Sequence, residues 1–194
     1  MSNDEKKNKK VQTEALVVRV KEGDHDAFSQ LYDLFIDQIF RYVFYRVKST
    51  DAEDLVEIVF MKVWENIDKY KVKKKNSFSA WVYRIAHNLV VDYYRSKKDR
   101  DYSELGIDVP TKDREHNAIR MAERSLDKDN LKGAMKNLKQ SYQDIILYKF
   151  INELTNTEIA QILGKSEGSL RILQHRALKA LKKEMLDMGI KYEF

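Results

Sequence analysis

The side chains best placed to do chemistry in this chain are hydrogen-bond donors near its C-terminus. Residues 155–181 read TNTEIAQILGKSEGSLRILQHRALKAL. Arg171, Gln174 and His175 recur at steps that put them on one face of a helix. Arg and Gln side chains pair with base edges in the major groove of DNA. The segment therefore predicts a helix that reads a DNA sequence.

The residues around these donors predict a helix-turn-helix. Thr155 and Glu158 have the spacing of a capping box, Gly164 predicts the turn, and Ser166 can cap the second helix. We expect Arg171, Gln174 and His175 to face bases. The other residues predicted to contact DNA are small or basic: Lys165, Ser166, Gly168, Ser169, Arg176 and Lys179. Among them, we expect the cations to hold phosphates. The alternative is a helical hairpin whose basic face is simply solvated.

A second basic cluster lies at 71–77. It contains Lys71, Lys73, Lys74, Lys75, Asn76 and Ser77, at a predicted helix start where free backbone N–H groups point outward. The next helix interleaves cations with aromatic rings, as binding of single-stranded nucleic acid requires. We expect Arg84, Asn88, Tyr94 and Arg95 to contact DNA, Tyr83 and Tyr94 to stack outward, and Trp81 to lie in the core. The alternative is an ordinary solvated loop.

The helix predicted from about residue 50 to 67 has two different faces. Thr50 and Glu53 have capping-box spacing, and Trp64 falls on the apolar face. The opposite face holds Asp51, Asp54, Ile58, Met61, Lys62 and Glu65. Apolar side chains among charges on an outer face suggest a protein contact. The alternative is a pair of stray exposed apolar residues.

Composition excludes several classes of protein. The chain has 194 residues, of which 43% are hydrophobic, and its net charge is only +5. It has no Cys, and its four His are scattered without metal-ligand or catalytic spacing, so we expect no enzyme activity, metal, cofactor or small-molecule substrate. No apolar run reaches about 18 residues and the start lacks a signal-peptide core. We therefore expect a cytoplasmic protein without membrane insertion.

Helical periodicity dominates, and one Pro and six Gly leave few places for hairpin turns. The sequence thus predicts an all-α fold with two separately folded helical domains. We place a disordered tail at 1–10, a helical domain at 11–96, a flexible linker at 97–125 and a second helical domain at 126–194. In the second domain, Ser141 and Asp144 can cap a helix. A linker of about 28 residues spans up to about 90 Å, more than the roughly 68 Å of two turns of DNA.

Three segments taken together resemble the sigma factors of bacterial RNA polymerase, most closely the small extracytoplasmic-function group. They are DAEDLVEIVFMKVW, FSAWVYRIAHNLVVDYYR and the helix-turn-helix, in that order. The resemblance covers about residues 24–98 and 126–184. It implies that the helix from Asp51 docks on the clamp helices of the polymerase. The 71–77 loop is then expected to capture a flipped base of the −10 element, and the helix from Glu167 to read the −35 element.

The resemblance implies a promoter-specificity subunit whose partners are core RNA polymerase, promoter DNA and an anti-sigma factor. The chain departs from the family at Glu57-Ile58, where Gln followed by an acid is usual, so the polymerase contact gains an apolar residue. One alternative is a stand-alone helix-turn-helix regulator with an N-terminal sensing or dimerisation domain. Another is an adaptor that binds polymerase or an inhibitor and reads no DNA.

Overall fold

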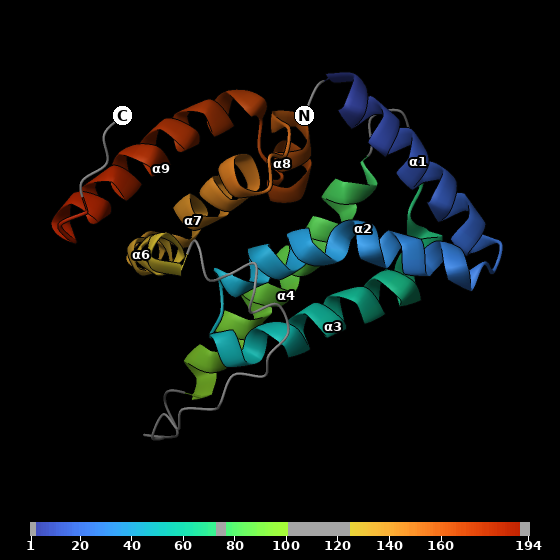
Figure 1. Cartoon of the computed structure of the whole chain (residues 1–194), viewed down its shortest axis with the longest axis horizontal. Coiled ribbons are helices and arrows are strands. Elements are labelled where there is room, and N and C mark those ends of the chain that lie inside the picture. Colours follow the sequence, from blue (N-terminus) through green and yellow to red (C-terminus); the bar gives the residue numbers. More distant parts are fainter. Residues whose placement is uncertain (1–2, 73–76, 101–124, 191–194) are drawn as a thin grey trace.

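A computed structural model describes residues 3–72, 77–100 and 125–190, and over these the regular structure is helical (Figure 1). This agrees with the predicted all-α fold. The elements are α1 (Asn3–Lys21), α2 (His25–Phe44), α3 (Ser49–Asn66), the 3₁₀ turn η1 (Ile67–Lys69), α4 (Phe78–Arg100), α6 (Ser125–Lys136), α7 (Gln140–Ile146), the π-helical η3 (Leu147–Ile151), α8 (Asn156–Leu163) and α9 (Glu167–Asp187).

Helices α1 to α4 form the N-terminal domain. Gly23, at φ +93°, makes the turn between α1 and α2, a conformation that costs glycine little. Asp24 then caps α2 by accepting a 3.0 Å hydrogen bond from the backbone N–H of Ala27. Leu31 and Phe35 follow on the face of α2 that is buried in the core.

Helix α1 is longer than predicted. The structure has residues 3–10 as its first turns, so the expectation of a disordered tail was wrong for this stretch; residues 1–2 lie outside the described residues. Lysine and glutamate are good helix formers, and Leu16, Val17 and Val20 bury the later turns of α1. A helix anchored at one end extends readily through such residues.

The predicted capping box of α3 was also wrong. The helix begins at Ser49, and its N-cap is Lys48, so Thr50 already lies inside the first turn. The Thr50 hydroxyl donates a 2.9 Å hydrogen bond to Asp51 and does not cap the helix. The threonine–glutamate spacing was therefore present without the backbone geometry that a capping box requires.

Helices α6 to α9 form the C-terminal domain, in which α9 packs against α6, α7 and α8. Ile145, Ile159 and Leu170 are fully buried at the centre of this domain. The predicted linker, 97–125, is shortened at both ends, because α4 continues to Arg100 and α6 begins at Ser125. Residues 101–124 lie outside the described residues.

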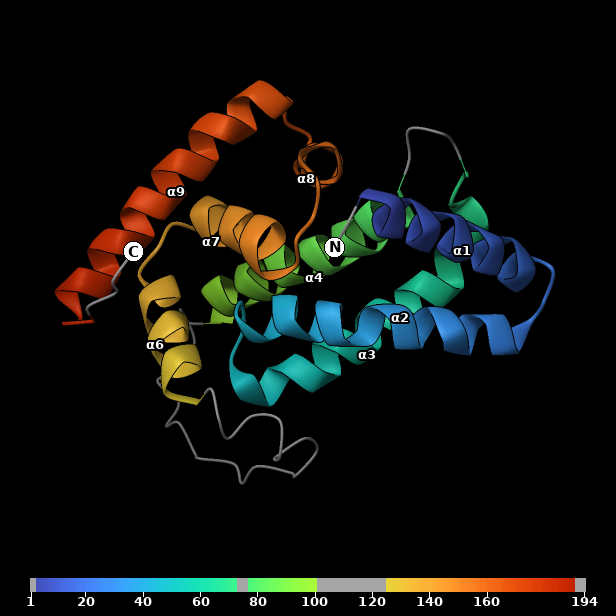
Figure 2. The same cartoon turned by 45° about the horizontal axis from the view of Figure 1, so that its top comes forward.

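The two domains pack against each other. Helix α8 lies on α4, and Figures 1 and 2 both show α7 and α8 between the N-terminal domain and α9. Tyr42 of α2 stacks on Tyr148 of η3 with ring centroids 5.0 Å apart, and Tyr83 of α4 meets the same ring edge-on at 5.7 Å. The chain thus has the two helical domains that the sequence predicts, and in this conformation one cluster of buried residues runs across both.

Candidate nucleic-acid and polymerase interfaces

The helix-turn-helix has the geometry that its sequence predicts. Thr155 and Glu158 form the capping box of α8: the Glu158 N–H donates to the Thr155 hydroxyl, and the Thr155 N–H donates to the Glu158 carboxylate. Gly164 ends α8 in the left-handed conformation, at φ +62°. Ser166 then caps α9 by accepting from the N–H of Ser169 at 3.3 Å. These local signals fix both helices and the turn between them.

Helix α9 buries one side and exposes a basic one. Leu170 and Ala177 are fully buried against the rest of the domain. The predicted DNA-contact residues that are exposed are Lys165, Ser166, Gly168, Ser169, Arg171, His175, Arg176 and Lys179. Helix α9 lies on the side of its domain away from α2 and α4 (Figure 2). Packing against the N-terminal domain therefore leaves this basic face open.

Gln174 differs from the other predicted readers of bases. It is only partly exposed, and its Nε2 donates a 3.0 Å hydrogen bond to the side chain of Asn156 at the start of α8. The Thr157 hydroxyl donates a second such bond, of 2.8 Å, to Glu167 at the start of α9. These two contacts hold the helices of the motif together. Sequence reasoning missed Asn156 and Thr157, because only the fold brings them beside α9.

The residues of the N-terminal domain that were predicted to contact the −10 element fall into three groups. Arg84, Asn88 and Arg95 are exposed on α4, and Lys71 is exposed before it. Lys73, Lys74, Lys75 and Asn76 lie outside the described residues. Ser77 accepts a hydrogen bond from the Ala80 N–H at 3.4 Å and donates one of 2.7 Å to Glu158 of α8. The residue at the end of the lysine loop thus contacts the helix-turn-helix directly.

The prediction that Tyr83 stacks outward from α4 was wrong. Tyr83 is fully buried, because the face of α4 that carries it packs on the C-terminal domain. Tyr94 is partly buried, and its hydroxyl donates to the backbone carbonyl of Arg46. Trp81, predicted in the core, is partly exposed beside Tyr70 and Phe78. The helical period identifies the faces of α4, but it does not say which face a second domain covers.

The outer face of α3 is exposed as predicted and is more apolar than predicted. Asp54, Ile58, Met61, Lys62 and Glu65 are all exposed, whereas Asp51 is half-buried and accepts a 2.5 Å hydrogen bond from the Tyr93 hydroxyl. Trp64 was expected inside, but it is 40% exposed at the edge of this face, stacked on His25 and edge-on to Phe28. Exposed Tyr32 packs nearby on Phe60. Ile58, Met61, Trp64 and Tyr32 are hereafter the α3 apolar face.

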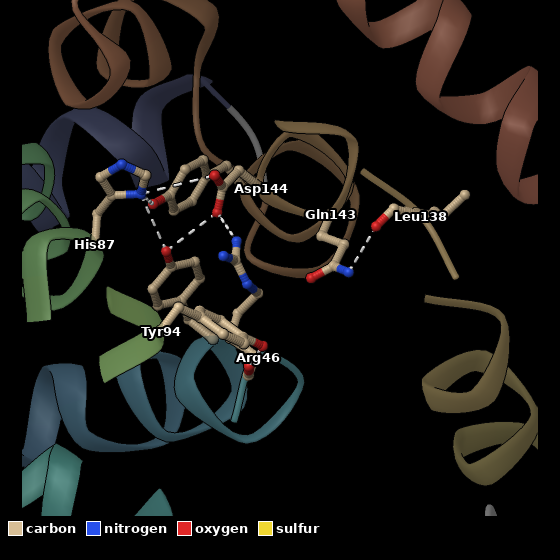
Figure 3. A network of polar contacts seen from close by, with 8 residues as sticks. Arg46, His87, Tyr94, Leu138, Gln143 and Asp144 are labelled. Atoms are coloured by element: carbon tan, nitrogen blue, oxygen red, sulfur yellow. Dashed lines mark hydrogen bonds and ion pairs between the residues drawn. The ribbon is translucent and has the colours of Figure 1, made fainter. Parts of the chain in front are cut away.

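A buried polar network joins the domains (Figure 3). Arg46, just after α2, forms an ion pair with Asp144 of α7, and both side chains are almost fully buried. The Tyr42 hydroxyl donates to the same carboxylate at 3.2 Å, and the Nδ1 atom of His87 on α4 lies 3.8 Å from it. The Tyr148 hydroxyl lies 3.2 Å from that nitrogen. Asp144 was predicted as a helix cap, so its pairing with the other domain was not foreseen.

Burial favours the neutral form of the two tyrosines in this network still further than their ordinary pKa does. It raises the pKa of the Tyr42 and Tyr148 hydroxyls well above the ordinary value of 10.0, and the nearby Asp144 charge raises the pKa further. Both hydroxyls, which are neutral at physiological pH even at the ordinary pKa, thus stay protonated and available as donors. Beside them, Gln143 donates a 2.9 Å hydrogen bond to the Leu138 carbonyl, which ties the start of α7 to the turn that precedes it (Figure 3).

The described residues hold no cluster of three or more His, Cys, Asp or Glu that could bind a metal. None of the helices in the described part of the chain has the length and apolar composition of a bilayer-spanning segment. The exposed functional groups are instead the cations of α4 and α9 and the α3 apolar face. Such surfaces suit binding to polyanions and to protein.

Comparison with known proteins shows which family carries these surfaces. The sequence matches the Sigma-70 region 2 family over residues 31–100 and the Sigma-70 region 4 family over residues 128–181. It is 30% identical over 182 residues to the ECF RNA polymerase sigma factor SigW of Bacillus subtilis; the match covers 89% of this chain and 96% of SigW. The chain belongs to the extracytoplasmic-function group of sigma-70 factors.

Two further comparisons agree with this assignment. The sigma factor is 33% identical over 174 residues to the ECF RNA polymerase sigma factor BldN of Streptomyces coelicolor; the match covers 89% of this chain but spans only 65% of BldN. Its fold resembles that of the sigma factor RpoE, solved with the anti-sigma factor NepR from Bartonella quintana. The TM-score is 0.67 at 21% identity, over 81% of this chain and 96% of RpoE.

As a sigma factor, the protein is a promoter-specificity subunit that binds core RNA polymerase, recognises promoter elements and promotes opening of the duplex. The two matched regions fall in the two helical domains, on either side of residues 101–124. These matches do not favour the alternative of a stand-alone regulator, since both domains belong to polymerase-associated families.

Proposed function

We propose that residues 11–96 form the polymerase- and −10-binding domain, that 97–125 act as the linker, and that 126–194 form the −35-binding domain. The observation that carries this division is the position of α9: the helix lies on the side of its domain away from the N-terminal domain, and its basic residues are exposed. A recognition helix needs this exposure to enter a major groove. The lysine-rich loop at 71–77, which we assign to the −10 element, belongs to the N-terminal domain. Each domain therefore has its own DNA-binding surface.

In the −35 domain, Arg171 and His175 read base edges, while Lys165, Arg176 and Lys179 hold phosphates. All five side chains are exposed on or beside α9. Gln174 has a different role from the one its sequence position suggests. Because its amide is bound by Asn156, it orients α9 against α8 and takes a smaller part in direct reading.

In the −10 domain, the lysine loop and the exposed cations of α4 hold the opened strand. Lys71, Arg84, Asn88 and Arg95 are exposed along this route. Cations beside an unpaired strand neutralise its phosphates and disfavour reannealing. Tyr94, by contrast, is hydrogen-bonded to the backbone of Arg46, so it becomes available for stacking only if that contact opens.

The α3 apolar face binds core polymerase. Ile58 is 39%, Met61 61% and Trp64 40% exposed, which is a concentration of large apolar side chains that isolated surfaces seldom carry. Ile58, where the family usually has an acid, enlarges this face. The charged residues Asp54, Lys62 and Glu65 form its polar rim.

We further propose that the protein works in the cytoplasm without catalysing a reaction, and that an anti-sigma factor controls it, as NepR accompanies RpoE. The decisive experiment is run-off transcription with purified core polymerase, with and without this chain. Promoter-specific transcripts are expected only with both present. A footprint on promoter DNA by the chain alone, with no effect on transcription by core polymerase, would instead support a stand-alone regulator.

A further inference from the structure

We propose that Ile172 on α9 packs against the C5-methyl group of a thymine in the −35 element, and that this contact makes the sigma factor prefer thymine at that position. The other predicted contacts of the helix are donors, cations or small residues, so Ile172 is its apolar contact with a base. The proposal deepens the proposed function and rests on it, because it requires α9 to lie in the major groove of the −35 element.

Ile172 is exposed where the fold gives no reason for an apolar residue. Its side chain is 57% exposed, whereas Leu170 is fully buried and Leu173 packs against the core. Isoleucine is also a poorer choice for an exposed helix position than alanine or a long polar residue, because its β-branch loses rotamer freedom against the preceding turn. Packing and helix propensity therefore do not account for this residue, whereas a contact with a partner does.

Ile172 lies in the middle of the outward face of α9. At about 100° per residue, it falls on the side of the helix opposite the buried Leu170 and Ala177. Three more residues on the same outward line are also exposed: Gly168, His175 and Lys179. When a helix enters the major groove, side chains on this line point toward the base edges, and long side chains on its flanks reach either bases or phosphates. Ile172 is thus placed to meet a base.

The charges around Ile172 select the kind of partner. Arg171 and Arg176 are exposed on its two flanks. The acid of the first turn, Glu167, accepts a hydrogen bond from the Thr157 hydroxyl. An apolar side chain flanked by cations suits a polyanion that presents an apolar group between its two backbones. In the major groove of DNA that group is the C5-methyl of thymine.

Gly168, one turn before Ile172 on the same line, allows the helix to approach DNA closely. It is exposed in the first turn of α9, and a Cβ added there would meet no atom within 4 Å outside its chain neighbours and the backbone of its own helix. Its φ is not positive, so alanine would fit and would favour the helix. The protein's own packing therefore does not require glycine here. A surface without a Cβ lets DNA come close, which brings the groove floor within reach of Ile172.

Leu178 offers a comparison within the same helix. It is also a large apolar residue and is 42% exposed. Because it follows the buried Ala177 directly, it lies on a flank of α9 and away from the outward line. Exposed apolar residues occur singly on many protein surfaces, and Leu178 is one of these. A thymine contact at Ile172 therefore predicts different effects for the same substitution at these two residues.

The experiment removes one methyl group from the DNA at a time. Duplexes randomised over the −35 region and selected with the holoenzyme first supply the element. Each of its thymines, on both strands, is then replaced by uracil, which lacks only the C5-methyl. We expect one replacement to lower the affinity of the parent holoenzyme by about fourfold, the effect of burying one methyl group. Ile172→Ala should lower affinity for the thymine duplex by a similar factor and show no further loss with uracil.

Two further substitutions complete this comparison. Ile172→Val keeps two methyl groups on the β carbon, so it should retain most of the thymine preference. Leu178→Ala is the matched control and should keep the full preference of the parent, and thermal melts confirm that each variant is folded. Equal affinity of the parent holoenzyme for thymine and uracil at every position would overturn the contact, and so would a preference that survives Ile172→Ala.

A failure of the proposed function would look different. If scrambling the whole −35 element left holoenzyme affinity unchanged, α9 would not read this element, and the Ile172 contact would fall with it. A holoenzyme that needs the element but does not distinguish thymine from uracil would overturn the Ile172 contact alone.

Gly168→Ala tests the close approach separately. We expect its melting temperature to equal or exceed that of the parent, because alanine favours the helix, and its affinity for core polymerase to be unchanged. Affinity for the selected promoter should fall by about fourfold or more, together with the thymine preference, because the added Cβ holds α9 away from the bases. Unchanged promoter affinity would overturn the close approach on which the contact depends.

Discussion

The hydroxyl of Thr157 lies 2.8 Å from the carboxylate of Glu167 and donates a hydrogen bond to it, which ties the start of α8 to the start of α9. The bond between Gln174 and Asn156 repeats this connection less than two turns further along α9. Together they set the angle at which the recognition helix leaves its supporting helix. A small rotation there moves Arg171 relative to the bases.

Removing these ties should weaken reading of the −35 element. We expect Asn156→Ala with Thr157→Ala to reduce holoenzyme affinity for a promoter by about tenfold, because a side-chain hydrogen bond contributes on the order of 1 kcal/mol. Affinity for core polymerase should not change. Ser141→Ala, at an exposed serine of α7, serves as control. Unaltered promoter affinity in a gel-shift titration would show that the ties are not needed for positioning.

Arg171 is expected to specify a base. Arg171→Ala should cost about 1–3 kcal/mol at one position of the −35 element and relax the preference there. Lys179→Ala should weaken binding by a similar factor on every sequence and reduce the salt dependence of binding. Affinities across a library of single-base promoter variants distinguish the two patterns. A uniform loss for Arg171→Ala would mean that it holds only phosphate.

The lysine loop is expected to act on opened DNA. Changing Lys73, Lys74 and Lys75 together to Ala should impair duplex opening more than formation of the closed promoter complex, because cations along a single strand stabilise it. The measurement compares transcription from a duplex template with that from a pre-opened bubble. The defect should largely disappear on the bubble, and an equal defect on both templates would contradict the assignment.

The α3 apolar face is expected to carry polymerase affinity. Met61→Ala and Trp64→Ala should each weaken binding to core polymerase by about tenfold, near 1.4 kcal/mol. Val11→Ala is the matched control, since Val11 on α1 and Met61 are both 61% exposed. Competition against a labelled sigma factor gives the affinities, and thermal melts confirm folding. Equal effects of Met61→Ala and Val11→Ala would remove α3 from the interface.

The cap of α2 predicts a pH dependence of stability. The Ala27 N–H, and then the Arg19 guanidinium at 2.6 Å, lower the pKa of Asp24 below its ordinary 3.8. Because the folded-state pKa is the lower one, the carboxylate stabilises the fold fully above about pH 4, and this contribution is lost as the pH falls through the folded-state value. Asp24→Ala should therefore lower the urea midpoint at neutral pH and have little effect in strong acid. Equal losses at both pH values would contradict this linkage.

Local signals in the sequence determined much of this protein. The Thr155–Glu158 box, Gly164 and Ser166 are sufficient for the helix-turn-helix, because capping and turn preferences act over a few residues. Apolar periodicity likewise identified the outer face of α3 and the exposed cations of α9. These features depend on neighbours close in the chain, so their spacing can be read directly.

Only the tertiary structure decided which faces meet between the domains. Tyr83 and Asp144 are separated by the linker in sequence, yet both are buried in the shared interface. An aspartate in a helix is usually solvated, and nothing around Asp144 marks Arg46 as its partner. Burial of a charge depends on a matching charge brought from a distant segment, and that pairing is a property of the fold and not of local spacing.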